Sequence, residues 1–84
     1  LWQMSNLILD LYTQKKCGYC VEMKEKLTEW GYGYREINIS YDDDAKQFLR
    51  TEGHRTVPQL YYDGRHLNKV ETHLLTKEML DESF

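Results

Sequence analysis

The sequence has few of the residues that mark several common classes of protein. Proline occurs once and cysteine twice in 84 residues. Two cysteines are too few for a disulfide-stapled mini-protein, and within one chain they cannot supply a four-thiolate zinc site. No stretch approaches the roughly 18 continuous apolar residues of a membrane span. Lys and Arg total 11 against 14 Asp and Glu, and the net charge of −3 argues against nucleic acid as the main partner.

One domain is expected for residues 1–84, because a chain of this length rarely holds more than one hydrophobic core. The composition, 40% hydrophobic and 30% charged, is that of an ordinary folded protein. Met4 is a candidate initiator, and Leu1–Gln3 would then be a cloning remnant; a frayed native terminus is the alternative. The fold prediction therefore starts at Leu7.

Hydrophobic periodicity predicts a strand, a helix and a second strand in the first half of the chain. Residues 7–12 are nearly all apolar, which is typical of a central strand covered on both faces. Apolar residues then recur at the spacing of one helix face: Cys20, Met23, Leu27 and Trp30. Gly31 and Gly33 are expected to end this helix, and residues 34–39 to form the second strand. Elements of these lengths make a βαβ unit with parallel strands.

A second helix is predicted after Ser40 or Asp42, either of which can cap it. The acidic run Asp42–Asp44 would be stabilised by the positive end of the helix dipole, which supports a helix start here. The run can also be interpreted as a docking patch. The inner face of this helix is predicted from its apolar residues: Ala45, Phe48 and Leu49. Gly53 is expected to end it.

The last third of the sequence predicts a hairpin and a helix. Pro58 stands at the start of a strand over residues 59–62, a place where proline is tolerated. Asp63-Gly64 is a strong two-residue turn signal, so residues 65–67 form an antiparallel strand. A helix over residues 72–82 would bury four residues: Leu74, Leu75, Met79 and Leu80. The predicted order is βαβ-α-ββα.

A Cys-x-x-Cys pair, Cys17 and Cys20, stands at the predicted start of the first helix. Residues three apart on a helix are neighbours, so the pair can form and reopen a disulfide without unfolding the chain. Cys17 lies outside the apolar face, where the free N–H groups of the helix start stabilise a thiolate, and Lys15 and Lys16 add positive charge. Cys20 lies on the buried face. We therefore expect Cys17 to attack a disulfide and Cys20 to resolve the mixed disulfide that results.

Two other interpretations of the pair have less support. It can be half of a zinc knuckle, but a closed zinc site needs two further ligands. The candidates, His54, His66 and His73, stand at no recognisable ligand spacing, so no metal is expected. Two unrelated buried cysteines are disfavoured by the strand-loop-helix context, in which this motif is typical of redox proteins.

At these positions the sequence resembles the glutaredoxins, small members of the thioredoxin superfamily. Three segments carry the resemblance, which runs from Leu7 to Leu80: Cys17-Gly18-Tyr19-Cys20, Thr56-Val57-Pro58 and Asp63-Gly64. The first is similar to the family's Cys-Pro-Tyr-Cys, with Gly18 in place of proline. Tyr19 and the short chain are more similar to the small glutaredoxins of bacteria and their viruses than to thioredoxin.

The resemblance implies an α/β thioredoxin-like fold, with a four-stranded mixed sheet, helices on both faces and a cis bond before Pro58. It also implies that glutathione lies beside Cys17, with its backbone paired to Val57 as an added strand pairs with a sheet edge. Lys15 is nearest to the family's carboxylate-binding lysine, and Lys16 remains an alternative. The implied glutathione-binding residues are Lys15, Tyr19, Thr56, Val57 and Pro58, with Arg55, Glu71 and Thr72 as further candidates.

The sequence departs from the family pattern after the hairpin. Glutaredoxins usually have Gly-Gly and then an acidic residue there, which hold the γ-glutamyl end of glutathione. This chain has Leu67-Asn68-Lys69-Val70-Glu71-Thr72, without either glycine. Glu71 or Thr72 can take over that contact or can simply cap the last helix, and Arg55 can equally be a solvated surface residue.

The cysteine pair predicts a thiol–disulfide oxidoreductase, and the resemblance implies a monomeric, cytoplasmic one that uses glutathione to reduce protein disulfides and glutathione mixed disulfides. Ribonucleotide reductase is a plausible protein partner by the resemblance, and no nucleic acid or membrane partner is expected. One alternative is an electron donor recharged by thioredoxin reductase, which the missing glycines favour. A second is a dimer that holds a [2Fe–2S] cluster with glutathione, because Gly18 frees a backbone N–H that proline would lack.

Overall fold

The computed structural model describes residues 7–67 and 70–84 of the chain. The expectation about Leu1–Gln3, and the positions Asn68 and Lys69 where the family has its two glycines, lie outside the described residues. No helix in the described part of the chain is long and apolar enough to cross a membrane.

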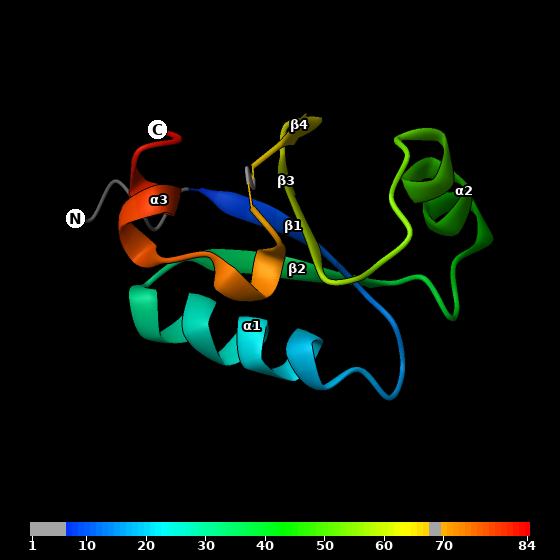
Figure 1. Ribbon diagram of the computed structural model, residues 1–84, viewed down its shortest axis with the longest axis horizontal. Helices are drawn as coiled ribbons and strands as arrows, with labels where there is room; N and C mark the ends of the chain where they lie inside the picture. Colours follow the sequence, from blue (N-terminus) through cyan, green and yellow to red (C-terminus); the bar gives the residue numbers. More distant parts are fainter. Residues whose placement is uncertain (1–6, 68–69) are drawn as a thin grey trace.

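Four strands form one mixed sheet in the order β2-β1-β3-β4 (Figure 1). The central strand β1 (Ile8–Thr13) pairs in parallel with β2 (Gly33–Asn38) and antiparallel with β3 (Gln59–Tyr62). The edge strand β4 (Arg65–His66) pairs antiparallel with β3. The predicted mixed sheet and βαβ unit are thus confirmed, with Gly33 opening β2 rather than ending the helix before it.

One face of the sheet holds the main hydrophobic core. Leu9 and Leu11 of β1 are fully buried there, as every second residue of a strand points to the same face. Helix α1 (Gly18–Trp30) covers this face with Met23 and Leu27, and Gly31 ends it in the left-handed conformation at a φ of 84°. Figure 1 shows α1 running along the sheet with the short helix η2 beside it.

The opposite face carries α2 (Asp43–Thr51), so helices cover both faces as expected. Phe48 of α2 stacks on Tyr12 of β1, with ring centroids 5.5 Å apart, and meets the ring of Tyr61 in β3 at 5.2 Å. The carboxylate of Asp42 accepts a hydrogen bond from the backbone N–H of Ala45 at 3.0 Å. Asp42 rather than Ser40 is therefore the cap of this helix.

The turn between β3 and β4 has the conformation that the Asp63-Gly64 sequence predicts. Asp63 and Gly64 both have positive φ, 51° and 78°, which is the conformation of a two-residue type I′ turn. The strand β4 that follows is shorter than predicted, since it ends at His66. The N–H of Leu67 still donates to the carbonyl of Leu60 at 3.0 Å, so the pairing direction was predicted correctly.

The prediction of one continuous helix over residues 72–82 is wrong. A 3₁₀ turn, η2 (Thr72–Leu74), is followed by extended backbone at Leu75 and then by α3 (Lys77–Asp81), which Thr76 caps. The break buries Leu75 and Leu80, at 3% and 0% exposure, and leaves Leu74 and Met79 at 58% and 41%. Leu75 after η2 and Leu80 in α3 therefore both reach the core, and the extended backbone between η2 and α3 makes this possible.

Candidate active site

The two cysteines lie at the first turn of α1 and are joined by a disulfide, with their Cα atoms 5.2 Å apart. Cys17 is the N-cap of the helix, with extended backbone, and its Sγ accepts a hydrogen bond from the N–H of Cys20 at 3.1 Å. Cys17 is half-buried, whereas Cys20 is only 2% exposed. The predicted positions and the asymmetry in burial are thus present, and the roles assigned from them remain a prediction.

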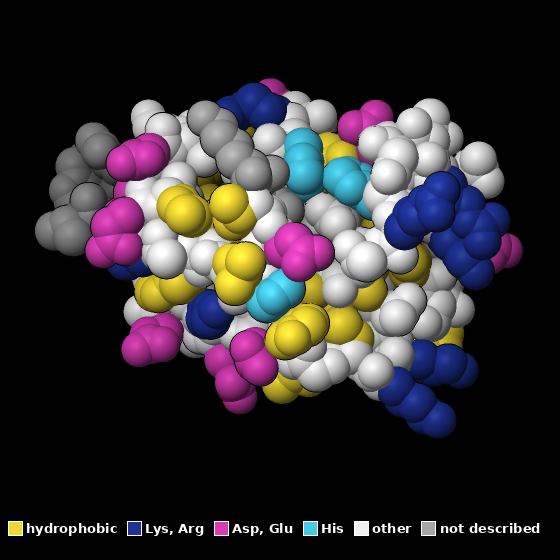
Figure 2. Space-filling model, in the orientation of Figure 1, with side chains coloured by type: hydrophobic (Ala, Val, Ile, Leu, Met, Phe, Trp, Pro, Cys, Tyr) yellow, Lys and Arg dark blue, Asp and Glu magenta, His cyan; other side chains and the backbone are white. Residues whose placement is uncertain are grey.

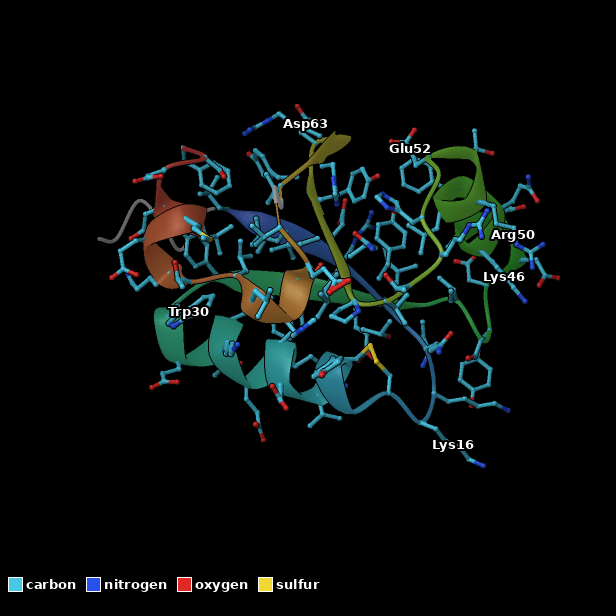
Figure 3. The ribbon with its side chains drawn as sticks, in the orientation of Figure 1. Lys16, Trp30, Lys46, Arg50, Glu52 and Asp63 are labelled. Carbon is cyan, nitrogen blue, oxygen red and sulfur yellow. A yellow bond between two sulfur atoms is a disulfide. The ribbon has the colours of Figure 1, made fainter. Side chains whose placement is uncertain are left out.

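The loop that precedes β3 passes beside the disulfide. The Sγ atom of Cys17 lies 4.0 Å from the carbonyl oxygen of Val57. The bond between Val57 and Pro58 is cis, as the resemblance implied, and Pro58 is buried. Figure 3 draws the disulfide in yellow at the start of α1, so the pair and this loop form one site.

Side-chain hydrogen bonds hold this loop from its other side. The amide nitrogen of Gln59 donates to the carbonyl of Thr56 at 3.0 Å, and its amide oxygen faces Nε2 of His66 at 2.9 Å. Since the Gln59 nitrogen is the donor to Thr56, its oxygen is the acceptor and His66 Nε2 carries a proton. These contacts fix the backbone that leads into Val57.

A second set of contacts anchors the loop to β3. The hydroxyl of Tyr61 donates to Glu52 at 3.1 Å and therefore accepts from Nε2 of His54, 2.7 Å away. Burial, together with the bond to Glu52, raises the pKa of Tyr61, so its hydroxyl stays protonated. Desolvation and the nearby His54 lower the pKa of His66. From the sequence alone, His54 and His66 were candidates only as metal ligands, and Tyr61 and Glu52 had no assigned role at the site, because nothing in a local pattern marks these contacts.

Tyr19 flanks the disulfide on the side of η2. Its ring is 51% exposed and stacks on the ring of His73, with centroids 4.2 Å apart and planes 7° from parallel. The carbonyl of His73 accepts a hydrogen bond from Nζ of Lys26 at 3.1 Å, which fixes η2 against α1. The sequence predicted Tyr19 at the site but not His73, which is far away along the chain.

The other predicted residues are distributed around the pair. Lys15 and Lys16 are exposed, and Lys16, with a φ of 57°, points away from the disulfide in Figure 3. Arg55 and Thr56 are exposed on the loop before Val57. The choice between Lys15 and Lys16 as the lysine that faces a ligand stays a prediction.

Glu71 and Thr72 differ from one another in burial. Thr72 is buried within η2, while Glu71 precedes it, is exposed and makes no side-chain capping hydrogen bond. Glu71 therefore occupies the N-cap position of η2 without capping it through its side chain. Within residues 7–67 and 70–84, no three His, Cys, Asp or Glu side chains are grouped as a metal ion would require.

A cleft of about 570 Å³ opens beside the site. It extends from Val57 and Thr56 past Arg55 to Lys46 and Arg50 of α2. The disulfide therefore has Tyr19 on one side and, across the Val57 backbone, a cleft whose lining includes three cationic side chains.

The sequence and the fold are similar to those of known proteins. Residues 9–67 match the family model described as Glutaredoxin. Over 60 residues the chain is 33% identical to Glutaredoxin 1 of Rickettsia conorii, and the aligned segment covers 68% of this chain and 59% of that protein. Over 62 residues it is 31% identical to Glutaredoxin 3 of Escherichia coli, and the aligned segment covers 70% of this chain and 72% of that protein. The chain thus spans less than two thirds of the length of the Rickettsia relative.

The glutaredoxin-like protein NrdH-redoxin from Escherichia coli has the same fold. It superposes with a TM-score of 0.71 at 20% identity, over 90% of this chain and 93% of that one. The described architecture is accordingly the thioredoxin-like fold that glutaredoxins share. With a family model that matches well over half of its residues, the chain belongs to the glutaredoxin family.

Proposed function

We propose that the protein is a glutathione-dependent thiol–disulfide oxidoreductase that reduces protein disulfides and glutathione mixed disulfides. The observation that carries the proposal is the first turn of α1. Cys17 caps the helix, and its sulfur accepts a hydrogen bond from the N–H of Cys20. A thiolate at Cys17 therefore gains a charge-assisted hydrogen bond. The buried Cys20 is less accessible to a substrate and is suited to the second step.

The reaction proceeds by two sulfur exchanges. The Cys17 thiolate attacks one sulfur of the substrate disulfide, forms a mixed disulfide and expels the other substrate sulfur as a thiolate. The Cys20 thiolate then attacks Cys17, closes the disulfide seen in the structure and releases the second substrate sulfur, which takes a proton from water. Two glutathione thiols reopen the pair and become glutathione disulfide, so two electrons pass from glutathione to the substrate.

The proposed position of glutathione is beside Cys17. The Val57 backbone lies within 4.0 Å of Sγ and is proposed to pair with the tripeptide. Tyr19, Thr56 and Pro58 would surround the sulfur, and Lys15 or Arg55 would bind a carboxylate. Glu71 and Thr72 remain candidates for the γ-glutamyl end.

A second candidate is a glutaredoxin-like electron donor recharged by thioredoxin reductase. The replacement of the family's Gly-Gly by Asn68-Lys69 favours it, since that pair holds the γ-glutamyl end in relatives. Oxidised protein should be reduced by glutathione with glutathione reductase and NADPH if our proposal is correct. Reduction only by thioredoxin reductase with NADPH would establish the second candidate instead.

The alternative function, a dimer that holds a [2Fe–2S] cluster, can be tested on purified protein. If our proposal is correct, the protein purified without oxygen in the presence of glutathione should be colourless and monomeric. Visible absorbance together with a dimer on gel filtration would assign the cluster function that Gly18 permits. As further parts of the proposal, we place the protein in the reducing cytoplasm and name ribonucleotide reductase as a protein substrate to be assayed.

Cysteine variants separate the two steps. Cys17→Ser should abolish turnover of every disulfide. Cys20→Ser should retain turnover of a small glutathione mixed disulfide, because a second glutathione can release Cys17, and should lose most activity on a protein disulfide. It should also trap a covalent complex with the protein, visible on a non-reducing gel. Equal losses on the two substrates would contradict the assigned role of Cys20.

A further inference from the structure

Tyr19 needs a neighbour to keep its ring in one conformation. It stands between the two cysteines on the first turn of α1, and its side chain is 51% exposed. Exposed side chains change rotamer within nanoseconds unless a contact holds them. Within residues 7–67 and 70–84, Tyr19 makes no side-chain hydrogen bond, and the ring that it contacts is that of His73. His73 is therefore the residue that can fix the Tyr19 ring beside the disulfide.

The contact between the two rings is close and nearly parallel. Their centroids lie 4.2 Å apart and their planes differ by 7°. Aromatic pairs attract one another beyond the area that they bury. Figure 2 shows histidine and hydrophobic side chains together at the surface where η2 meets the start of α1. The imidazole covers one face of the tyrosine ring and leaves the rest of that ring open to a substrate.

His73 is held in place independently of Tyr19. Its carbonyl accepts a hydrogen bond from Nζ of Lys26 at 3.1 Å, and Lys26 stands two helical turns after Tyr19 on the same face of α1. Thr72 is buried, and its carbonyl accepts the N–H of Leu75 at 3.0 Å. The backbone of η2 is thus fixed on both sides of His73. The backbone therefore positions the imidazole, and the imidazole positions the Tyr19 ring.

A ring that is fixed before the substrate arrives lowers the cost of binding. Tyr19 flanks the disulfide on the side of η2, and the Val57 carbonyl oxygen lies 4.0 Å from Sγ of Cys17 on another side. Without the stack, a substrate that binds there has to immobilise the Tyr19 ring itself, which weakens binding about 2- to 10-fold for one side chain. The bound substrate and the transition state bear this cost equally. Loss of the stack should therefore raise the half-saturating substrate concentration and leave the maximal rate unchanged.

We propose that His73 is a positioning residue for the disulfide exchange, and that its imidazole holds the Tyr19 ring in the conformation that a substrate meets. The inference rests on the proposed oxidoreductase function and adds to it a residue of η2 that is not among those expected to bind glutathione. Because the contact is made through the face of the imidazole, the position requires a flat ring and not a ring nitrogen.

Three variants test this requirement. His73→Leu removes the flat ring, His73→Phe keeps one, and Leu74→Ala is the matched control, because it changes the exposed neighbour of His73 in η2. Pre-reduced protein is mixed with a peptide that is joined to glutathione by a disulfide, and the rate of a single turnover is followed. His73→Leu should raise the half-saturating concentration about 2- to 10-fold at an unchanged maximal rate. His73→Phe and Leu74→Ala should match the wild type.

A double-mutant cycle shows whether His73 acts through Tyr19. Tyr19→Leu should itself raise the half-saturating concentration, and His73→Leu should add nothing in that background. Additive increases would overturn the proposal, as would an increase in His73→Phe equal to that in His73→Leu. An equal increase in Leu74→Ala would assign the effect to η2 as a whole. Alkylation of Cys17 by iodoacetamide needs no docking and should be equally fast in all variants; slower alkylation in His73→Leu would assign the effect to the thiolate and also overturn the proposal.

Proton NMR without substrate distinguishes failure of this inference from failure of the proposed function. Stacked rings shift one another's ring-proton signals upfield, and the Tyr19 signals are those that Tyr19→Leu lacks. The upfield shift should be present in both redox states of the wild type, lost in His73→Leu and kept in His73→Phe. A wild type that shows the shift but reduces no disulfide would refute the proposed function and, with it, the role of His73. Normal turnover without the shift, or without an effect of His73→Leu, would refute the role of His73 alone.

Discussion

Gly18, which stands where the family has proline, allows a quantitative test of the active-site turn. It is the first residue of α1, a position where the backbone N–H has no acceptor within the helix and where proline is favoured. A Cβ atom built on Gly18 meets no atom within 4 Å. The residue before it, Cys17, has extended backbone with φ −119° and ψ 104°, close to the region that a residue preceding proline adopts. Gly18→Pro should therefore fit without strain.

The expected gain comes from the unfolded chain. A compatible proline restricts the unfolded ensemble and should raise the free energy of unfolding by about 0.4–1 kcal/mol. A domain of 84 residues has an unfolding entropy of roughly 0.18 kcal/mol/K at about 2.1 cal/mol/K per residue. The melting temperature of the oxidised protein, followed by circular dichroism at 222 nm, should rise by about 2–6 °C.

Gly18→Ala is the matched control, since it adds a Cβ and keeps the N–H. It should also stabilise the fold, because Ala suits a helical backbone better than Gly. Loss of stability in Gly18→Pro but not in Gly18→Ala would show that the Gly18 N–H donates a bond or that Cys17 cannot precede proline. Either result would refute the geometry assigned to this turn. A difference between the two variants in alkylation of Cys17 would report the contribution of that N–H to its thiolate.

Three further predictions address the fold around the site. Asp42→Ala should lower the free energy of unfolding in urea by about 1 kcal/mol, because the N–H of Ala45 loses its cap, whereas Asp42→Asn should cost much less. Desolvation and the neighbouring histidine lower the folded-state pKa of His66 below its ordinary 6.5, so the unfolded chain protonates first and stability falls as the pH drops below that value. His66→Gln should weaken this fall between pH 7 and pH 5 in urea titrations, and an unchanged slope would contradict the assignment. Leu80→Ala should cost about 2–5 kcal/mol and Leu74→Ala less than about 0.5, and similar costs would refute the break between η2 and α3.

The parts of the fold that could be predicted are those encoded by neighbours in the sequence. The inner face of α1, the cap at Asp42 and the turn at Asp63-Gly64 depend on residues within a few positions of one another. The cysteine pair is equally local, because both sulfurs belong to one turn of a helix. The family resemblance added the cis bond at Pro58, which no local pattern indicates.

The parts that were missed depend on residues far apart in the chain. The stacking of Tyr19 on His73 joins α1 to η2, and neither residue signals the other. The last helix was predicted as continuous because its leucines recur at helical spacing, but Leu75 and Leu80 reach the core only when the backbone extends between them. The charge of the cleft is another such property, since Lys46 and Arg55 lie on different segments that the fold brings together.

Because the sulfur of Cys17 is both the cap of α1 and a redox-active atom, the stability of the fold depends on the redox state of the cysteine pair. A thiolate accepts an N–H more strongly than a disulfide sulfur does, so reduction of the pair strengthens the first turn of α1. In a closed thermodynamic cycle, the stability that the fold gains on reduction equals the free energy by which the fold shifts the couple towards the dithiol. Each 1.4 kcal/mol of that gain corresponds to about 30 mV in a two-electron couple. A substitution in this turn therefore changes the reduction potential whenever it stabilises one redox state more than the other. A comparison of the free energies of unfolding in urea, with and without reductant, measures that change without an electrode.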